Sequence, residues 1–237
     1  MVSDLFSTAM REALAAEVCR YRLVIFDWDG TLMDSAARIV ACMQGAAREL
    51  GWPVLDDGTI RNIIGLGLPE AIAELYPDVT RQQQDRLREA YGHQFRLADR
   101  VPMPFFPGVV AGIERLRRDG SCRLAVATGK SRRGLDRVFG HEACGTWFAA
   151  SRTADLTRSK PHPQMLEELL AECDVPAAEA IMIGDTEYDM EMARAIGMDR
   201  IAVTYGVHDR RRLERSEPRL LADDFSTLVD WLFALSD

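Results

Sequence analysis

Residues 22–35 read RLVIFDWDGTLMDS, a short apolar run that ends in two aspartates one residue apart. The β-branched and aromatic residues of positions 22–26 predict a buried strand, and Gly30 predicts the turn that follows it. Asp27 and Asp29 therefore lie where this strand ends. Open α/β sheets bind their ligands at that edge, so the two carboxylates are candidates for chemistry.

Outside residues 34–104 the chain alternates between strand-like and helical patterns. Strands are predicted at residues 22–26, 123–128, 147–150, 180–184 and 200–204. Helices are predicted at residues 109–119, from 131 onward, at 163–172 and in the segment that ends at 197. This alternation predicts an α/β fold with a doubly wound, Rossmann-like parallel sheet.

Residues 34–104 are helical in character and interrupt this alternation after the first strand. Helical spacing of apolar residues recurs over 37–50 and 81–98, and the stretch VPMPFFPG at 101–108 predicts a linker. The expected organisation is an α/β core at 21–33 and 105–237 and an inserted helical domain at 34–104. Residues 1–20 are expected to form an N-terminal helical extension.

Composition narrows the class of protein. The chain has 237 residues, 47% of them hydrophobic, and a net charge of −8, so neither nucleic acid nor an anionic membrane is expected as a partner. Five widely spaced cysteines without a CxxC pair predict reduced thiols in a cytoplasmic protein. The sequence does not indicate an oligomeric state.

Chemically capable residues follow three of the predicted strands. Asp27 and Asp29 follow the first, Thr128, Gly129 and Lys130 end the second, Asp185 and Asp189 follow the fourth, and Lys160 precedes a nearby helix. Lys130 and Lys160 are the two lysines of the chain; the other 27 basic residues are arginines. Clustered carboxylates repel one another unless a cation binds among them, and oxygen ligands beside a phosphate suit Mg²⁺.

The aspartate pair is compatible with two mechanisms. Asp27 could attack as a nucleophile while Asp29 protonates the leaving oxygen and later activates water. Alternatively, the pair holds a metal ion and water is the nucleophile. The spacing of the two residues does not choose between these mechanisms.

Four motifs resemble those of the haloacid dehalogenase superfamily, and the resemblance runs from about residue 21 to 235. They are DWDGTLMDS at 27–35, Thr128 in VATGKS, Lys160 in KPHP, and GDTEYD at 184–189. The resemblance implies a phosphohydrolase in which Asp27 is the nucleophile and a Mg²⁺ ligand, and Asp29 is the acid/base and binds the metal through its carbonyl. It also implies that Asp185 completes the metal ligands with support from Asp189.

The same resemblance assigns the phosphoryl site. Thr128 and the Gly129 N–H would hold the phosphoryl group, and Lys160 would neutralise its charge. Lys130 could contact the substrate or lie at the surface, at the start of a helix; the second position is slightly preferred.

The helical insertion resembles the small cap of that superfamily, which favours a small phosphate ester. Gly65, in the loop GLGL at 65–68, and Arg61 are candidate substrate ligands, although the loop fits an ordinary turn about equally well. Asp29 argues against a true dehalogenase, and a cap without lysine argues against Schiff-base chemistry. The pattern most resembles phosphoglycolate phosphatase; a sugar phosphomutase or a catalytically silent binding protein are the alternatives.

Overall fold

The structure is a computed structural model that describes residues 19–98, 101 and 103–234. The helix predicted for residues 1–20 lies almost wholly outside this range and stays a prediction. Within the described range, no helix is both long enough and apolar enough to cross a membrane.

The core is a parallel sheet of six strands in the order β3-β2-β1-β4-β5-β6. This confirms the predicted α/β class, and the strand order is that of a doubly wound sheet. The strands are β1 (Leu23–Phe26), β2 (Arg123–Thr128), β3 (Ala150–Thr153), β4 (Ala180–Gly184), β5 (Asp199–Val203) and β6 (Leu220–Ala222).

One strand prediction was wrong, and one strand was not predicted. The third strand is Ala150–Thr153 rather than 147–150, because Trp147 closes a 3₁₀ turn and Phe148 packs on the Trp28 ring. The strand β6 was not predicted. Its three residues are too few to show the alternation of a strand, and its position depends on pairing with β5.

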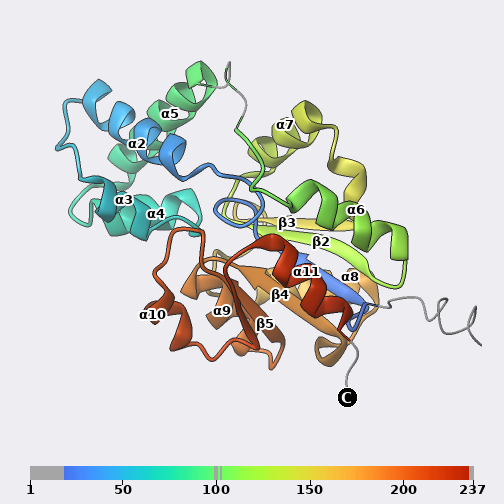
Figure 1. Cartoon of the computed structure of the whole chain (residues 1–237). Helices are drawn as coiled ribbons and strands as arrows, with labels where there is room; N and C mark the ends of the chain where they lie inside the picture. Colours follow the sequence, from blue (N-terminus) through green and yellow to red (C-terminus); the bar gives the residue numbers. More distant parts are fainter. Residues whose placement is uncertain (1–18, 99–100, 102, 235–237) are drawn as a thin grey trace, which may run out of the picture.

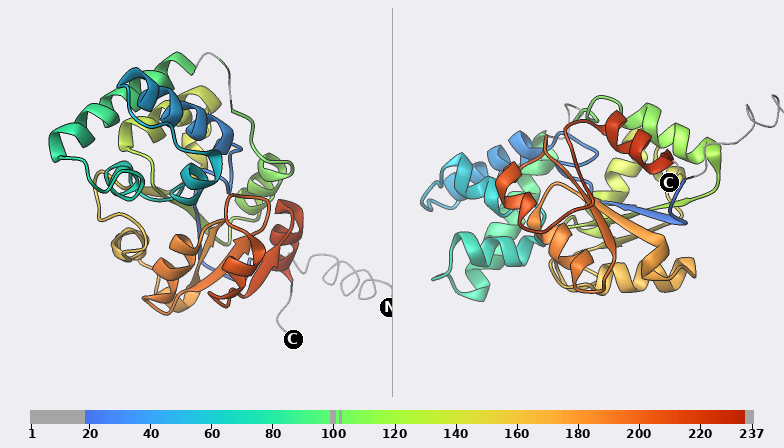
Figure 2. Two further views of the ribbon diagram at one scale, coloured as in Figure 1. Left: turned by 90° about the vertical axis from the view of Figure 1, so that its left-hand side faces the viewer. Right: turned by 60° about the horizontal axis from the view of Figure 1, so that its bottom comes forward.

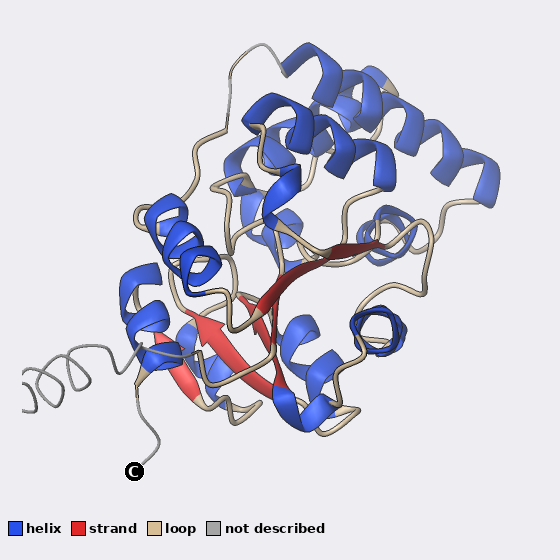
Figure 3. Cartoon of the chain, turned by 90° about the vertical axis from the view of Figure 1, so that its right-hand side faces the viewer, coloured by secondary structure: helices blue, strands red, loops and turns tan. Residues whose placement is uncertain are grey.

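Helices cover both faces of the sheet (Figure 3). Alternate residues of each strand point to opposite faces, so Val24 and Phe26 pack with one layer while Leu23 and Ile25 pack with the other. The first layer contains α6 (Val109–Asp119), α7 (Arg132–Glu142) and α11 (Phe225–Phe233); the second contains α8 (Gln164–Cys173) and α9 (Glu187–Arg194). The short helix α10 (Arg210–Glu214) packs against α9 and β6.

Four helices form a separate group beside the carboxyl ends of the strands (Figures 1 and 2). They are α2 (Ala36–Glu49), α3 (Asp57–Asn62), α4 (Leu68–Leu75) and α5 (Arg81–Ala98). We refer to α2–α5 as the helical unit. It has its own apolar core, in which Ile39 and Met43 of α2 pack with Ile72 of α4 and Leu87 of α5. The domain limits of the sequence analysis remain a proposal.

Candidate active site

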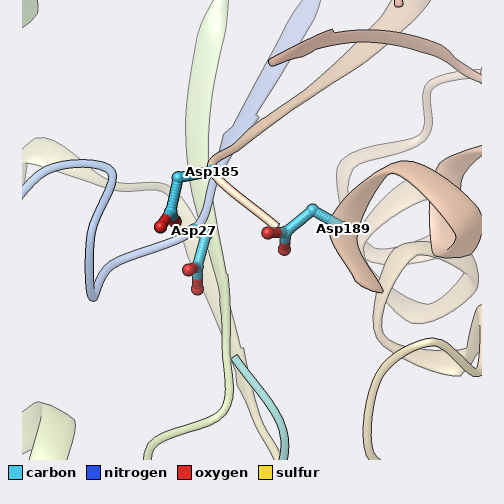
Figure 4. Close-up of side chains that lie close together, drawn as sticks. All are labelled: Asp27, Asp185 and Asp189. Carbon is cyan, nitrogen blue, oxygen red and sulfur yellow. The ribbon is translucent and has the colours of Figure 1, made fainter. Parts of the chain in front are cut away.

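Three buried carboxylates meet at the carboxyl edge of the sheet. Asp27 follows β1, Asp185 follows β4, and Asp189 lies in the first turn of α9. One oxygen of each lies within 4.8 Å of the others, and the three side chains converge (Figure 4). Strands β1 and β4 are neighbours, and their connections leave in opposite directions along the sheet, which is where doubly wound sheets bind ligands.

Lys160 places a buried positive charge among these carboxylates. Its Nζ lies 2.6 Å from Asp27 Oδ1 and 2.6 Å from Asp189 Oδ1, and its side chain is fully buried. Burial alone would lower the pKa of Lys160, but the charges of Asp189 and Asp27 raise it. The lysine is therefore protonated at physiological pH and offsets part of the negative charge of the cluster.

Hydrogen bonds fix the orientation of Asp185 and Asp189, the two carboxylates that follow β4. Asp185 accepts from Thr31 Oγ1 at 2.9 Å and from the Val207 N–H at 2.8 Å. Asp189 accepts from the hydroxyl of Thr186, the N-cap of α9, at 2.6 Å. Thr186 and Asp189 form a reciprocal capping box, so the start of α9 is stabilised by a residue of the cluster itself.

Lys160 does not fully offset the negative charge of Asp27 and Asp185. Burial raises the pKa of Asp27 well above its ordinary value, against the lowering effect of Lys160. Burial, together with the charge of Asp189, raises the pKa of Asp185 to about 7. Carboxylates with raised pKa values favour a bound cation or proton. A cation bound at the site would therefore reduce the repulsion among these carboxylates and the cost of burying them.

Two glycines permit close approach at the site. Gly30 has φ +88°, and a Cβ there would lie 2.2 Å from Asp185 Oδ2. A Cβ on Gly129 would lie 2.5 Å from the carbonyl oxygen of Leu66, in the helical unit. Gly30 is thus needed for the turn after β1, and Gly129 for contact between the core and the helical unit.

Asp29 lies beside the cluster but is not one of its three converging carboxylates. Its Oδ1 accepts from Ser35 Oγ at 2.5 Å and lies 2.8 Å from Lys130 Nζ. The Lys130 ammonium also lies 5.6 Å from the centre of the Phe95 ring of α5. The surface position favoured for Lys130 was therefore wrong: its side chain is 10% exposed and reaches the site from the start of α7.

The predicted phosphoryl ligands lie at the end of β2. Thr128 is fully buried, and its Oγ1 accepts from the Lys130 N–H at 3.2 Å. Gly129 lines a cavity of about 360 Å³ that also contains Asp27, Asp29 and Gly65. The structure thus brings Gly65 and Gly129 to the same cavity as the two aspartates.

Arg61 does not line this cavity, so the structure does not bring it together with Gly65 and Gly129 there. The adjacent Asn62 instead joins the helical unit to the core. Its carbonyl oxygen accepts from Tyr188 Oη at 3.0 Å and lies 3.3 Å from His208 Nε2, and its side chain accepts from Arg212. Sequence reasoning missed this contact, because the partners of Asn62 lie more than 120 residues away.

The donor set fits a divalent metal ion. Asp27 Oδ2 is buried and has no hydrogen-bond partner among the described residues, although a buried carboxylate oxygen ordinarily has one. A hard cation bound by Asp27 and Asp185 would satisfy this oxygen and reduce the repulsion that raises both pKa values. Asp189 is already engaged by Thr186 and Lys160, which suits a supporting position.

Comparison with known proteins gives the family. Residues 24–203 match the haloacid dehalogenase-like hydrolase family. The chain belongs to this family. The four motifs noted in the sequence all lie within the matched residues.

Several relatives of the chain are named as phosphatases. It is 36% identical over 219 residues to "Probable phosphatase IndB" of Dickeya dadantii, with 90% of this chain and 94% of that protein covered. It is 33% identical over 190 residues to a plasmid-encoded phosphoglycolate phosphatase of Cupriavidus necator, with 77% and 80% covered.

Solved structures share the fold. A hydrolase from Pseudomonas syringae aligns with a TM-score of 0.81 at 24% identity, covering 91% of this chain and 100% of that one. A haloacid dehalogenase-like family protein from Streptococcus pneumoniae aligns with a TM-score of 0.77 at 24% identity, covering 91% and 98%.

Proposed function

We propose that the protein is a Mg²⁺-dependent phosphatase that hydrolyses a small phosphate monoester through a phosphorylated Asp27. The observation that carries the proposal is the buried group of Asp27, Asp185, Asp189 and Lys160 at the junction of β1 and β4. Membership of the haloacid dehalogenase-like hydrolases and relatives named as phosphatases support it.

Asp27 is the nucleophile in this proposal. Its Oδ1 is held by Lys160, and Oδ2 has no hydrogen-bond partner among the described residues. Lys160 offsets the negative charge on the phosphoryl oxygens as Asp27 forms its bond to phosphorus. The Thr128 hydroxyl and the Gly129 N–H orient the phosphoryl group at the end of β2.

Asp29 is the general acid and base. It protonates the leaving oxygen while Asp27 is phosphorylated, and then removes a proton from the water that hydrolyses the phosphorylated aspartate. Ser35 holds its Oδ1 at 2.5 Å, which fixes the direction of the carboxylate. Two carboxylates are needed because the nucleophile cannot also donate the proton.

Asp27, the main-chain carbonyl of Asp29, and Asp185 would hold Mg²⁺, with Asp189 in support. When bound, the ion supplies positive charge that stabilises the transferring phosphoryl group. The raised pKa values of Asp27 and Asp185 support this assignment, because both carboxylates lack sufficient positive charge without it.

The helical unit is the cap of this enzyme in our proposal. It contributes Gly65, Leu66 and Leu68 to the cavity that contains the two catalytic aspartates. Backbone contact between Gly129 and residues 65–66 leaves little room for water at that side of the cavity. A cavity of this size favours metabolites over polymers, and the net charge of −8 disfavours nucleic acid.

The five cysteines are free and buried, which supports a cytoplasmic location.

Phosphate release from a panel of small phosphate esters, with Mg²⁺ and with EDTA, tests the proposal. Phosphoglycolate belongs in the panel because it gives several relatives their name. We expect Mg²⁺-dependent release from at least one ester. Asp27→Asn should reduce turnover by at least about 10⁴-fold, as expected for loss of a nucleophile.

Asp34→Asn is the matched control, because Asp34 is exposed in the same segment and its N–H bonds to Pro104. It should retain wild-type activity. Mg²⁺-dependent turnover by Asp27→Asn at more than a tenth of the wild-type rate would refute the covalent mechanism. Isomerisation of a sugar phosphate without phosphate release would indicate a mutase, and no reaction on any ester would refute catalysis.

A further inference from the structure

The cavity extends well beyond the catalytic aspartates, along the inner face of α5. Positions 88, 91, 92, 95 and 96 of this helix line it, which is the spacing of one helical face. Phe95 marks the catalytic end, because its ring contacts Lys130, which pairs with Asp29. Arg88 is seven residues earlier, so the cavity wall continues for roughly 10 Å along the helix axis.

The wall between these two ends is apolar. Ile39 and Met43 of α2, Ile63 after α3, and Tyr91 of α5 face the cavity. The volume of about 360 Å³ is within the range of roughly 300–1,000 Å³ in which pockets enclose drug-sized ligands. A two-carbon ester would leave most of this apolar wall in contact with water.

Four arginines line the cavity. Arg88 and Arg96 come from α5, and Arg133 and Arg137 come from α7 of the core. Arg88 pairs with Asp85, but this pair is about half exposed and contributes little to holding the guanidinium. Within the described part of the chain, no carboxylate lies within ion-pair distance of Arg96 or Arg133.

Negative charge is scarce on the same wall. Besides Asp27 and Asp29, the lining contains one carboxylate, Asp155, which already accepts from the Arg132 N–H and from Thr153 Oγ1. The wall is thus positive in a protein whose net charge is −8. A phosphoryl group at Asp27 is served by Lys160, so these arginines exceed what one phosphate needs.

We propose that the substrate is a phosphate monoester with an apolar body and a second anionic group at its far end. The phosphoryl end lies at Asp27, the body lies against Tyr91 and Phe95, and the far anion is bound by Arg88 together with the arginines of α7. Guanidinium groups suit this role because they bind carboxylates and phosphates through paired hydrogen bonds. The proposal rests on the proposed phosphatase function and names its substrate class.

Calorimetric titration of the Mg²⁺-loaded full-length protein with phosphonates, which are not hydrolysed, tests the proposal. The probes are 4-carboxybenzylphosphonate, its neutral analogue 4-carbamoylbenzylphosphonate, p-xylylenediphosphonate, and the two-carbon phosphonoacetate. Two of the aromatic probes, 4-carboxybenzylphosphonate and p-xylylenediphosphonate, carry an anionic group at each end, and we call them the dianions. We expect at least one of the dianions to bind about tenfold more tightly than the carbamoyl probe and phosphonoacetate. The relative affinities of the two dianions show whether the far anionic group of the substrate is a carboxylate or a second phosphate.

Variants locate the second anion. Arg88→Gln and Arg133→Gln should each reduce the affinity for the preferred dianion more than that for the carbamoyl probe. Arg86→Gln is the matched control, because Arg86 is an exposed residue of α5 that does not line the cavity. It should leave all four affinities unchanged.

The proposal is overturned if the carbamoyl probe binds as tightly as both dianions, or if phosphonoacetate binds most tightly. Its failure is distinguishable from failure of the proposed function. Phosphate release from esters without any preference for a second anion refutes only the substrate class. Tight binding of the dianions without turnover of the corresponding esters refutes only the phosphatase.

Discussion

The two lysines of the chain both pair with aspartates of the first motif, but in different surroundings. Lys160 is fully buried and contacts Asp27 and Asp189. Lys130 is 10% exposed, pairs with Asp29, and faces the cavity beside Phe95 of the helical unit. The first lysine belongs to a buried cluster at the sheet edge. The second lies where the core meets the helical unit, on the wall of the cavity in which we propose that the substrate binds.

The surroundings of the two lysines correspond to two tasks, the reaction and the choice of substrate. The cluster around Lys160 has the same chemistry for any phosphate ester. Its partners are Asp27, which follows β1, and Asp189, in the first turn of α9. The cavity wall around Lys130 is built from helices of two units and contains apolar and positive groups. In our interpretation the cluster determines the reaction and the wall determines the substrate.

The largest expected effect comes from Lys160→Met, measured as the free energy of unfolding in urea without metal. Removing Lys160 leaves Asp27 and Asp189 buried without their cation, which costs about 3–5 kcal/mol at neutral pH. Lys130→Met is the matched comparison. Its ion pair lies at the cavity, so we expect a loss of only about 1 kcal/mol. Equal losses in the two variants would contradict the distinction drawn here.

A smaller change in stability is expected from metal binding. It depends on the buried carboxylates and not on the cavity wall. The pKa of Asp185 is raised to about 7 from 3.8, so its burial destabilises the folded protein increasingly as pH rises between these values. Mg²⁺ should offset this cost: at about 100 times its Kd it should stabilise the wild type by about 2.7 kcal/mol. Asp185→Asn should remove most of this gain and should make the metal-free protein more stable at pH values above 7.

Thermal unfolding at several pH values, with Mg²⁺ and with EDTA, measures both effects. Lys130→Met should retain the Mg²⁺-dependent rise in Tm, because Asp29 lies outside the three converging carboxylates. A rise in Tm of the same size in wild type and Asp185→Asn would place the ion elsewhere.

The smallest effect concerns the contact between the helical unit and the core. Tyr188→Phe removes the hydrogen bond to Asn62 O and should reduce the unfolding free energy by about 1 kcal/mol. Tyr76→Phe removes a similar hydrogen bond to Pro53 O within the helical unit, so it should reduce the unfolding free energy by the same amount as Tyr188→Phe. Only Tyr188→Phe should also raise KM, by up to about fivefold. Equal KM changes would show that the Asn62 contact has no part in substrate binding.

Much of this protein follows from its sequence. The apolar runs before Asp27, Thr128 and Asp185 predict strands, and their alternation with helices predicts a parallel sheet. The carboxyl ends of parallel strands share one edge, so the meeting of Asp27 with Asp185 follows from order along the chain. Short-range patterns are sufficient here, because burial of both sheet faces requires continuous apolar strands.

The tertiary structure decided what local patterns could not. β6 has three residues and exists through pairing with β5, and the third strand starts at Ala150 because Phe148 packs on Trp28. Lys130 turned toward Asp29 rather than solvent because Phe95, from a distant helix, lies against its ammonium group. The contact of Asn62 with the core likewise joins segments far apart in sequence. Sequence periodicity reports which residues are buried, but only the packing of whole elements decides which distant side chains meet.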